Sequence, residues 1–173
     1  VGVSMYFSFS KYGNTLNKES FKRLAKRTIL IFAIGLFLNS FPQWARDFSK
    51  LRILGVLQRI AIVYGITSLI VLSTRKSWLP YISATILLLY WGILYYFGNE
   101  APFSLEGNAT LLFDRAILGE NHMYHGFGIP FDPEGLLSTI PAIVTALLGY
   151  MAGALIHKSE ETKIEYPHLV IVQ

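Results

Sequence analysis

The feature that most constrains this chain is a series of apolar blocks, each of about 20 residues, with the charged residues gathered between them. Crossing the roughly 30 Å hydrocarbon core of a bilayer takes about 20 apolar residues at about 1.5 Å rise each. Backbone groups in hydrocarbon must satisfy their own hydrogen bonds, and no block alternates with the two-residue period of a barrel strand. The pattern therefore predicts an all-α, polytopic bundle of transmembrane helices.

Four complete spans are predicted, at 28–44, 53–72, 78–97 and 136–157, after the end of an earlier span at 1–10. Residues 98–135 are predicted to form a long loop outside the membrane. The chain begins Val-Gly-Val-Ser-Met without an initiator methionine, so we expect 1–173 to be one membrane domain and a fragment of a longer protein. With no cysteine, disulfides and thiolate catalysis are excluded for this stretch.

The distribution of Lys and Arg among the connecting segments predicts which side each loop occupies, because short basic loops stay in the cytoplasm. Alternate segments carry ten basic residues on one side (Lys11, Lys18, Lys22, Arg23, Lys26, Arg27, Arg75, Lys76, Lys158, Lys163) and four on the other (Arg46, Lys50, Arg52, Arg115). The loop 98–135 then lies on the exterior side. The net charge of +4 comes from basic residues that lie where the positive-inside rule places them. We therefore expect contact with lipid and no nucleic-acid partner.

The segment 18–27 is the most basic part of the chain. A cytoplasmic flank of the first span explains it most simply. A lipid-binding amphipathic helix or a site for an anionic cofactor would carry the same charges, and these alternatives stay open.

The second block contains Gln58 and Arg59, although a charge at the centre of a membrane helix costs a few kcal/mol on insertion scales. Arg59 is expected about six residues, or roughly 9 Å, inside the exterior end of its span. In one interpretation it locks helices together through loop carbonyls or carboxylates, with Asp132, Glu134 and Asp114 as the expected partners. In the other it lines a polar cavity and binds an anionic group of a substrate or cofactor.

The exterior loop supplies the remaining candidates for chemistry. Asp132 and Glu134 flank Pro133 just before the fourth span, and this order predicts a capped helix start, with acid–base chemistry as a second use. His122 and His125 are three residues apart, which suits ordinary loop hydrogen bonding, catalysis or substrate contact. We assign no metal site to this spacing.

Three further features concern the helices themselves. Asn39 and Gln43 lie near the exterior end of the first span and predict a polar vestibule together with Gln58 and Arg59. Pro141 lies inside the predicted fourth span and would kink it. In the same span, the small residues at 142, 146, 149 and 153 predict close packing against another helix.

Three stretches, RILGVLQRIAIVY, DRAILGENHMYHG and FDPEGLLSTIPAIVTALLGYMAG, resemble in this order the heparan-alpha-glucosaminide N-acetyltransferase family. The resemblance extends from the start of the chain to about His157, less than half of a family member. It implies acetyl transfer from cytoplasmic acetyl-CoA to an amino sugar or other small acceptor across the membrane, and the bacterial inner membrane as the location.

The resemblance also implies a set of site residues, since Gln58, Arg59, His122, Asp132 and Glu134 match polar positions of the family motifs. We predict catalytic roles for Arg59, His122, Asp132 and Glu134, with Arg59 as an electrostatic anchor oriented by Asp132 or Glu134 and His122 contacting the acceptor. Gln58, Asn39 and His125 are predicted to bind substrate.

The family's acyl-accepting histidine lies in a loop that precedes this stretch, so neither His122 nor His125 is given that role. The fragment alone is not expected to be active. A transporter-like or purely structural membrane protein without acyl transfer is the alternative, and a homo-oligomer stays open.

Overall fold

The computed structural model describes residues 1–173 apart from 11–14, 42–47, 127 and 166–173. In the described part the chain is helical and contains no strand, only an isolated bridge between Tyr124 and Phe131. The helices are α1 (Gly2–Ser10), α2 (Lys18–Ser40), α3 (Val56–Ser73), α4 (Leu79–Phe97), α5 (Ala109–Leu118) and α6 (Thr139–Glu165), with short 3-10 turns η2 (Phe48–Lys50), η3 (Lys76–Trp78) and η4 (Glu120–His122). The all-α prediction is confirmed.

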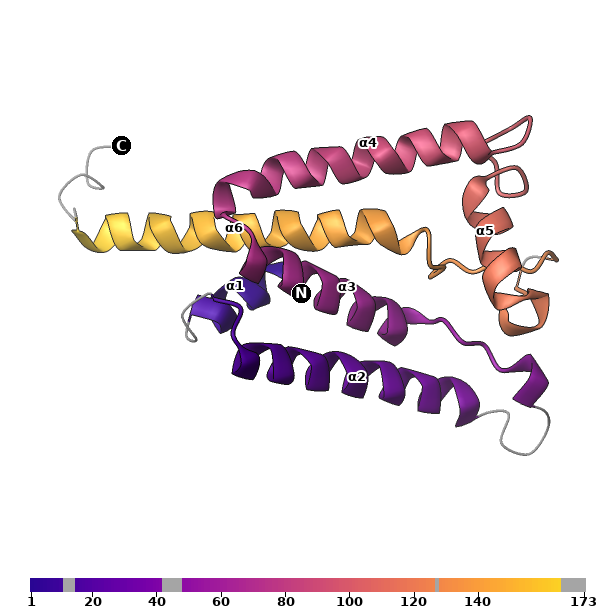
Figure 1. Ribbon diagram of the computed structural model, residues 1–173, viewed down its shortest axis with the longest axis horizontal. Coiled ribbons are helices and arrows are strands. Elements are labelled where there is room, and N and C mark those ends of the chain that lie inside the picture. The colour runs from indigo at the N-terminus through magenta and orange to yellow at the C-terminus, as the bar shows by residue number, and fades with distance from the viewer. Residues whose placement is uncertain (11–14, 42–47, 127, 166–173) are drawn as a thin grey trace.

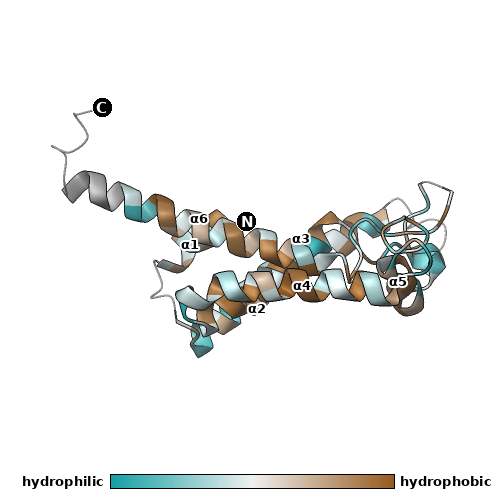
Figure 2. Ribbon diagram, turned by 90° about the horizontal axis from the view of Figure 1, so that it is seen from above, coloured by the Kyte–Doolittle hydropathy of each residue, from teal (hydrophilic) through white to brown (hydrophobic). Residues whose placement is uncertain are grey.

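Four long helices run side by side, and α5 crosses one end of the bundle (Figure 1). Helix α3 packs against α2 and α6, α4 packs against α6, and the short α1 packs on α6. We call the end that carries α5 the loop end. The polar loops gather there, whereas long apolar stretches colour the helices between the two ends (Figure 2).

Three helical segments of the described chain are long and apolar enough to cross a membrane: Val56–Ser73, Lys76–Phe97 and Thr139–Ser159. Helix α2 is not among them because basic residues continue to Arg27, and the apolar part from Thr28 to Ser40 spans only about 20 Å at about 1.5 Å per residue. The fold is thus that of a helical membrane bundle.

Two helix starts differ from the predicted ones. Helix α6 begins at Thr139, so Asp132 is not its N-cap, and the preceding residues form turns instead. Pro141 is consequently the third residue of α6, where a missing N–H costs nothing and no kink follows. Helix α3 begins at Val56, which places Arg59 in its first turn and nearer the loop end than expected.

The predicted small-residue stripe of α6 is the surface on which α1 packs. A Cβ on Gly149 would lie 3.2 Å from the Cα of Gly2, and one on Gly153 would lie 3.0 Å from the Cβ of Tyr6. Gly2 in turn would place a Cβ 2.1 Å from the carbonyl oxygen of Ala146. The contact at Gly2 leaves no room for a Cβ, and those at Gly149 and Gly153 are tight, so the prediction of close packing is confirmed.

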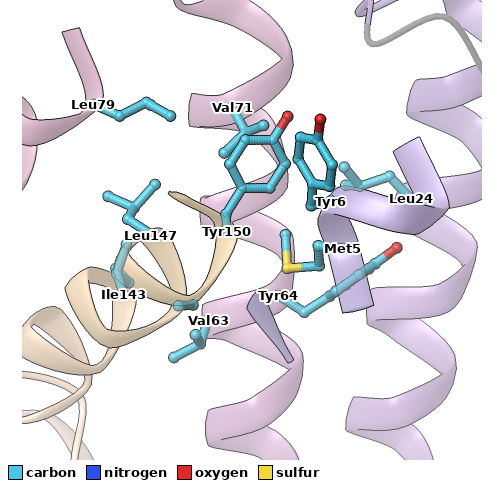
Figure 3. Close-up of a cluster of buried hydrophobic side chains, with 11 residues drawn as sticks. Met5, Tyr6, Leu24, Val63, Tyr64, Val71, Leu79, Ile143, Leu147 and Tyr150 are labelled. Carbon is cyan, nitrogen blue, oxygen red and sulfur yellow. The ribbon is translucent and has the colours of Figure 1, made fainter. Parts of the chain in front are cut away.

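The buried core lies where α1, α2, α3, α4 and α6 meet (Figure 3). Tyr150 of α6 is 1% exposed, and its ring lies edge-on to Tyr6 with the centroids 5.3 Å apart. Met5, Val63 and Leu147 fill the space around this pair. The core therefore fixes α3 and α6 relative to each other, which positions the loops at both helix starts.

Candidate functional site

The site is built around the segment 132–138, which connects the loop to the start of α6. Arg52, just before α3, binds both of its acidic side chains, with Nε donating to Asp132 Oδ1 at 3.1 Å and Nη2 donating to Asp132 and to Glu134. The Arg52 guanidinium also lies over the ring of Tyr124, 5.1 Å from its centroid. Asp132 is 7% exposed, so this ion pair is largely shielded from solvent.

Arg59 holds the same segment through its backbone. Its Nη1 donates to the carbonyl oxygen of Pro133 at 2.9 Å, and its Nη2 donates to that of Ser138 at 3.1 Å. The expectation that Asp132, Glu134 or Asp114 orients Arg59 is therefore wrong: Arg52 takes the first two carboxylates. The alternative expectation, a lock through loop carbonyls, describes the observed contacts.

Asp114 of α5 anchors the segment from a third side. It is 1% exposed, and its Oδ1 accepts a hydrogen bond from the backbone N–H of Leu136 at 3.0 Å. A Cβ on Gly135 would lie 1.7 Å from Asp114 Oδ2, so this contact requires glycine at 135. Three elements thus hold one short turn: α3 through Arg59, the residues before α3 through Arg52, and α5 through Asp114.

In each of these groups, burial and hydrogen bonding act on the pKa in opposite directions, and the net pKa is raised in all three. Burial raises the pKa of Asp114 to about 6, although the backbone N–H groups of Leu136 and Leu137 pull it down. Burial also raises the pKa of Asp132, and the Arg52 guanidinium offsets this only in part. For Arg52, burial acts to lower the pKa, but the bonds and charges of Asp132 and Glu134 outweigh it and raise the value. Carboxyls with raised pKa values are suited to proton transfer near neutral pH.

The two histidines occupy different positions around Arg52. His122 joins η4 to the residues before α3, since its Nδ1 bonds the carbonyl oxygen of Leu51 at 2.7 Å and its own carbonyl accepts from Ile53 N–H at 3.3 Å. His125 Nδ1 bonds the carbonyl oxygen of Met123 at 2.9 Å. A carbonyl can only accept, so in both rings Nδ1 carries the proton and a neutral ring presents Nε2 as a base.

The polar residues at the loop end of α2 and α3 are packed between the helices. Gln58 is 1% exposed, and a Cβ on Gly35 would lie 2.8 Å from its Oε1. Asn39 donates from Nδ2 to the carbonyl oxygen of Arg52 at 3.1 Å. Gln43, the remaining residue of the predicted vestibule, lies outside the described residues. These contacts join α2 to the Arg52 segment, and substrate binding by Gln58 and Asn39 stays a prediction.

A row of three cavities follows α3 from Arg59 toward the opposite end of the bundle. The first, of about 490 Å³, is lined by Arg59, Pro141 and Thr145 and shares Val1 and Ile60 with the second, of about 200 Å³. The second shares Ser8, Arg27 and Tyr64 with the third, of about 310 Å³. The third reaches Asn17, Ser20 and Arg23 at the start of α2.

A separate hollow of about 560 Å³ opens beside Arg52 at the loop end. Its lining residues are Lys50, Arg52, Asn121, Met123, Tyr124 and His125. His125 thus shares a cavity with Arg52, which was not among the predicted site residues, whereas Arg59 faces the row along α3. In the part of the chain that the structure describes, the predicted pair of Arg59 and His125 is not brought into one cavity. Among the described residues, no three His, Asp or Glu side chains are grouped as a metal site would need.

Sequence reasoning missed Arg52 and gave Asp114 only as a partner of Arg59. Arg52 lies immediately before an apolar span in the same predicted exterior layer as Asp132, and this shared layer was the available signal. Asp114 is placed by a hydrogen bond between residues 22 positions apart, which leaves no local pattern.

The fold and these contacts define an α-helical membrane protein with a charged, partly buried site at one end of the bundle. Comparison with known proteins adds a distant relationship. The heparan-alpha-glucosaminide N-acetyltransferase of Mus musculus is 25% identical over 190 aligned positions, covering 82% of this chain and 29% of the relative. The Homo sapiens protein of the same name is 26% identical over 183 positions, covering 78% and 27%. No family model matches the chain.

The chain is thus a distant relative of these N-acetyltransferases, and it spans less than a third of the length of either.

Proposed function

We propose that this chain forms part of a membrane N-acetyltransferase that transfers the acetyl group of cytoplasmic acetyl-CoA to an amino sugar on the exterior side of a bacterial inner membrane. The row of cavities along α3 carries this proposal, because neighbouring cavities share lining residues all the way from a basic end at Arg23 and Arg27 to Arg59. The distant relationship to proteins named N-acetyltransferases supports the same reaction.

The basic end of the row has groups suited to the phosphates of the donor. Arg23 and Arg27 line the third cavity together with Asn17 and Ser20, which form the capping box of α2. A guanidinium can bind two oxygens of one phosphate at once through two of its N–H donors. The guanidinium of Arg27 also lies over the ring of Tyr64, 5.0 Å from its centroid. This favours the anionic-cofactor interpretation of the segment 18–27.

At the other end of the row, Arg59 can serve the acyl-transfer step. The amine nitrogen attacks the thioester carbonyl carbon, the C–N bond forms, and the C–S bond breaks to release the CoA thiolate. Negative charge develops on the carbonyl oxygen, and an N–H donor placed there lowers the activation free energy by about 3–4 kcal/mol. A guanidinium has five N–H donors, and two of those on Arg59 already bind the backbone carbonyls that orient it.

The amine must lose a proton during this reaction. The bases at the loop end are the Nε2 atoms of His122 and His125 and the carboxyls of Asp132 and Glu134. His125 shares the hollow beside Arg52 with the aromatic ring of Tyr124, a surface on which a sugar ring can pack. Among the residues that the structure describes, this hollow shares no lining residue with the cavity at Arg59. We therefore place the entry of the acceptor here, with Arg52 holding the neighbouring carboxylates in position, and the amine has to pass the segment 132–138 to reach the thioester at Arg59.

The experiment measures transfer of labelled acetyl from acetyl-CoA to glucosamine by the full-length protein in phospholipid nanodiscs. We expect Arg59→Leu to lower the rate by about 100-fold or more, as loss of an oxyanion donor does. The matched control is Arg115→Leu, because Arg115 of α5 pairs with Glu120 of η4 at 3.4 Å and lines none of the three cavities of the row. Thermal unfolding of each variant separates loss of chemistry from loss of fold.

Unchanged activity in a folded Arg59→Leu variant would refute the role of Arg59. If the wild-type protein binds or moves glucosamine but transfers no acetyl group, the transporter-like alternative is correct.

A further inference from the structure

Helix α5 turns an apolar face outward and buries its acidic residue. Leu112, Phe113 and Ile117 are 39%, 43% and 59% exposed, and Ala116 is exposed between them. At about 100° per residue, these four positions form one continuous stripe around the helix. Asp114 lies on the other side and is 1% exposed. A helix that faces water has the opposite arrangement, with charges outward.

The apolar stripe is continuous with the outward surface of α4. A groove of about 460 Å³ between the two helices is lined by Ile93, Phe97, Ala109, Leu112, Phe113 and Leu137. On α4 itself, only 11% of the apolar window is buried. Its last turn ends in three exposed aromatic residues, Tyr95, Tyr96 and Phe97, at 65%, 80% and 63%. Aromatic residues of this kind gather where a membrane meets water.

The direction of α5 matches such a boundary. The helix crosses the loop end of the bundle, at the end of α4, instead of running along the spans (Figure 1). A bilayer that surrounds α4 would therefore contain α5 in the plane of its interface. Phe103 and Leu105, in the loop just before α5, are also exposed, at 64% and 44%.

We propose that α5 is an interfacial helix, with its face formed by Leu112, Phe113, Ala116 and Ile117 immersed in lipid and the groove beside Phe97 occupied by lipid hydrocarbon. Amphipathic helices bind membrane interfaces by burying such a face among the acyl chains. Lipid is the occupant that the continuity with α4 favours, over a second copy of the chain or another protein segment.

This position has a consequence for the site. Asp114, on the opposite side of α5, holds Leu136 by a hydrogen bond, and the same segment carries the carbonyls that bind Arg59. The membrane surface would therefore act as a fixed support behind the segment 132–138. The inference does not depend on acetyl transfer, since it follows from the faces of α5 alone.

Residues 1–173 contain no cysteine, so one introduced cysteine takes the only label within this stretch, and any cysteine elsewhere in the full-length protein is first replaced by serine. Single nitroxide labels are placed at Phe113→Cys and Ile117→Cys in the full-length protein in phospholipid nanodiscs, with Glu106→Cys in the same loop as the matched control. Oxygen partitions into lipid, whereas the nickel–ethylenediaminediacetate complex stays in water. We expect the ratio of oxygen to nickel accessibility to be several-fold higher at 113 and 117 than at 106.

Equal ratios at all three positions would show that the stripe faces water and would overturn the proposal. Labels at 113 and 117 shielded from both reagents would show that protein covers the face, which also overturns it. If the bulky positions do not tolerate a label, Ala116→Cys tests the same face with a small, conservative replacement.

Discussion

At the scale of single residues, the segment 132–138 is held by three kinds of contact. Arg52 binds carboxylates, Arg59 binds backbone carbonyls, and Asp114 accepts from a backbone N–H. Each contact compensates a different cost of burial, because a buried charge or an unpaired peptide group is expensive in a medium of low dielectric constant. Removing any one leaves its partner unpaired.

Asp114 makes the stability of this region depend on pH. Its pKa rises from 3.8 to about 6 in the folded chain, so the folded state retains the proton to a higher pH than the unfolded state. The contribution to stability is therefore full below about pH 4 and is lost as the pH rises toward about 6. Between pH 4 and 7, we expect the free energy of unfolding to fall by up to about 3 kcal/mol more in the wild type than in Asp114→Asn.

The measurement is chemical denaturation in detergent micelles at both pH values for each protein. Glu106→Gln, which changes an exposed acid of the same loop, should follow the wild type. Parallel pH curves for wild type and Asp114→Asn would contradict the assigned role of burial.

At the scale of elements, the closest contact in the bundle is between α1 and α6. It depends on backbone meeting backbone at Gly2 and Gly149, where there is no flexible side chain to move aside, and on Gly153 lying against Tyr6 and the backbone of Val3. The row of cavities borders the same pair of helices, with Val1 and Gly2 on one wall and Ala142 and Ala146 on the other. The position of α1 therefore sets the width of the cavity that Arg59 lines.

We expect Gly149→Leu to destabilise the bundle by about 1–3 kcal/mol, since the new side chain would enter the backbone of α1. The control is Gly92→Leu on α4, where nothing lies within 4 Å of the added Cβ. Gly92→Leu should leave stability unchanged or slightly raised, because leucine favours helix over glycine. Thermal unfolding in detergent compares the two, and equal effects would show that the α1–α6 contact is not tight.

At the scale of the whole molecule, the helix ends divide into two layers. The α3–α4 connection lies at one end, and α5 with its loops lies at the other (Figure 1). The excess of Lys and Arg predicts that the first end faces the cytoplasm.

Single cysteines test this orientation once any cysteine outside residues 1–173 has been replaced, since this stretch has none of its own. We expect Glu106→Cys to react with a membrane-impermeant maleimide in intact cells, and Ser77→Cys to react only after lysis. Both positions are exposed, so a difference in labelling reports the side of the membrane and not burial. The reversed pattern would invert the topology and, with it, the proposed side of the acceptor.

The sequence by itself determined the class of fold, the presence of a small-residue packing stripe and the group of polar residues from which the site is built. These properties follow from sums over about 20 neighbouring residues or from the helical repeat, so they are readable locally. The start of α6 could not be predicted from the sequence. Asp132 and Pro133 make a good local N-terminus for a helix, but the tertiary contacts of Asp132 with Arg52 override it.

Only the tertiary structure decided which charge pairs with which. Arg52 and Asp132 are 80 positions apart, and Arg59 and Pro133 are 74 apart. Both arginines lie toward the predicted exterior side, where these acids also lie, so the sequence offered Arg59 as a partner no less than Arg52. The start of α3 at Val56 settles the choice, because it leaves Arg52 in the loop layer beside the carboxylates and places Arg59 on a helix facing the carbonyls.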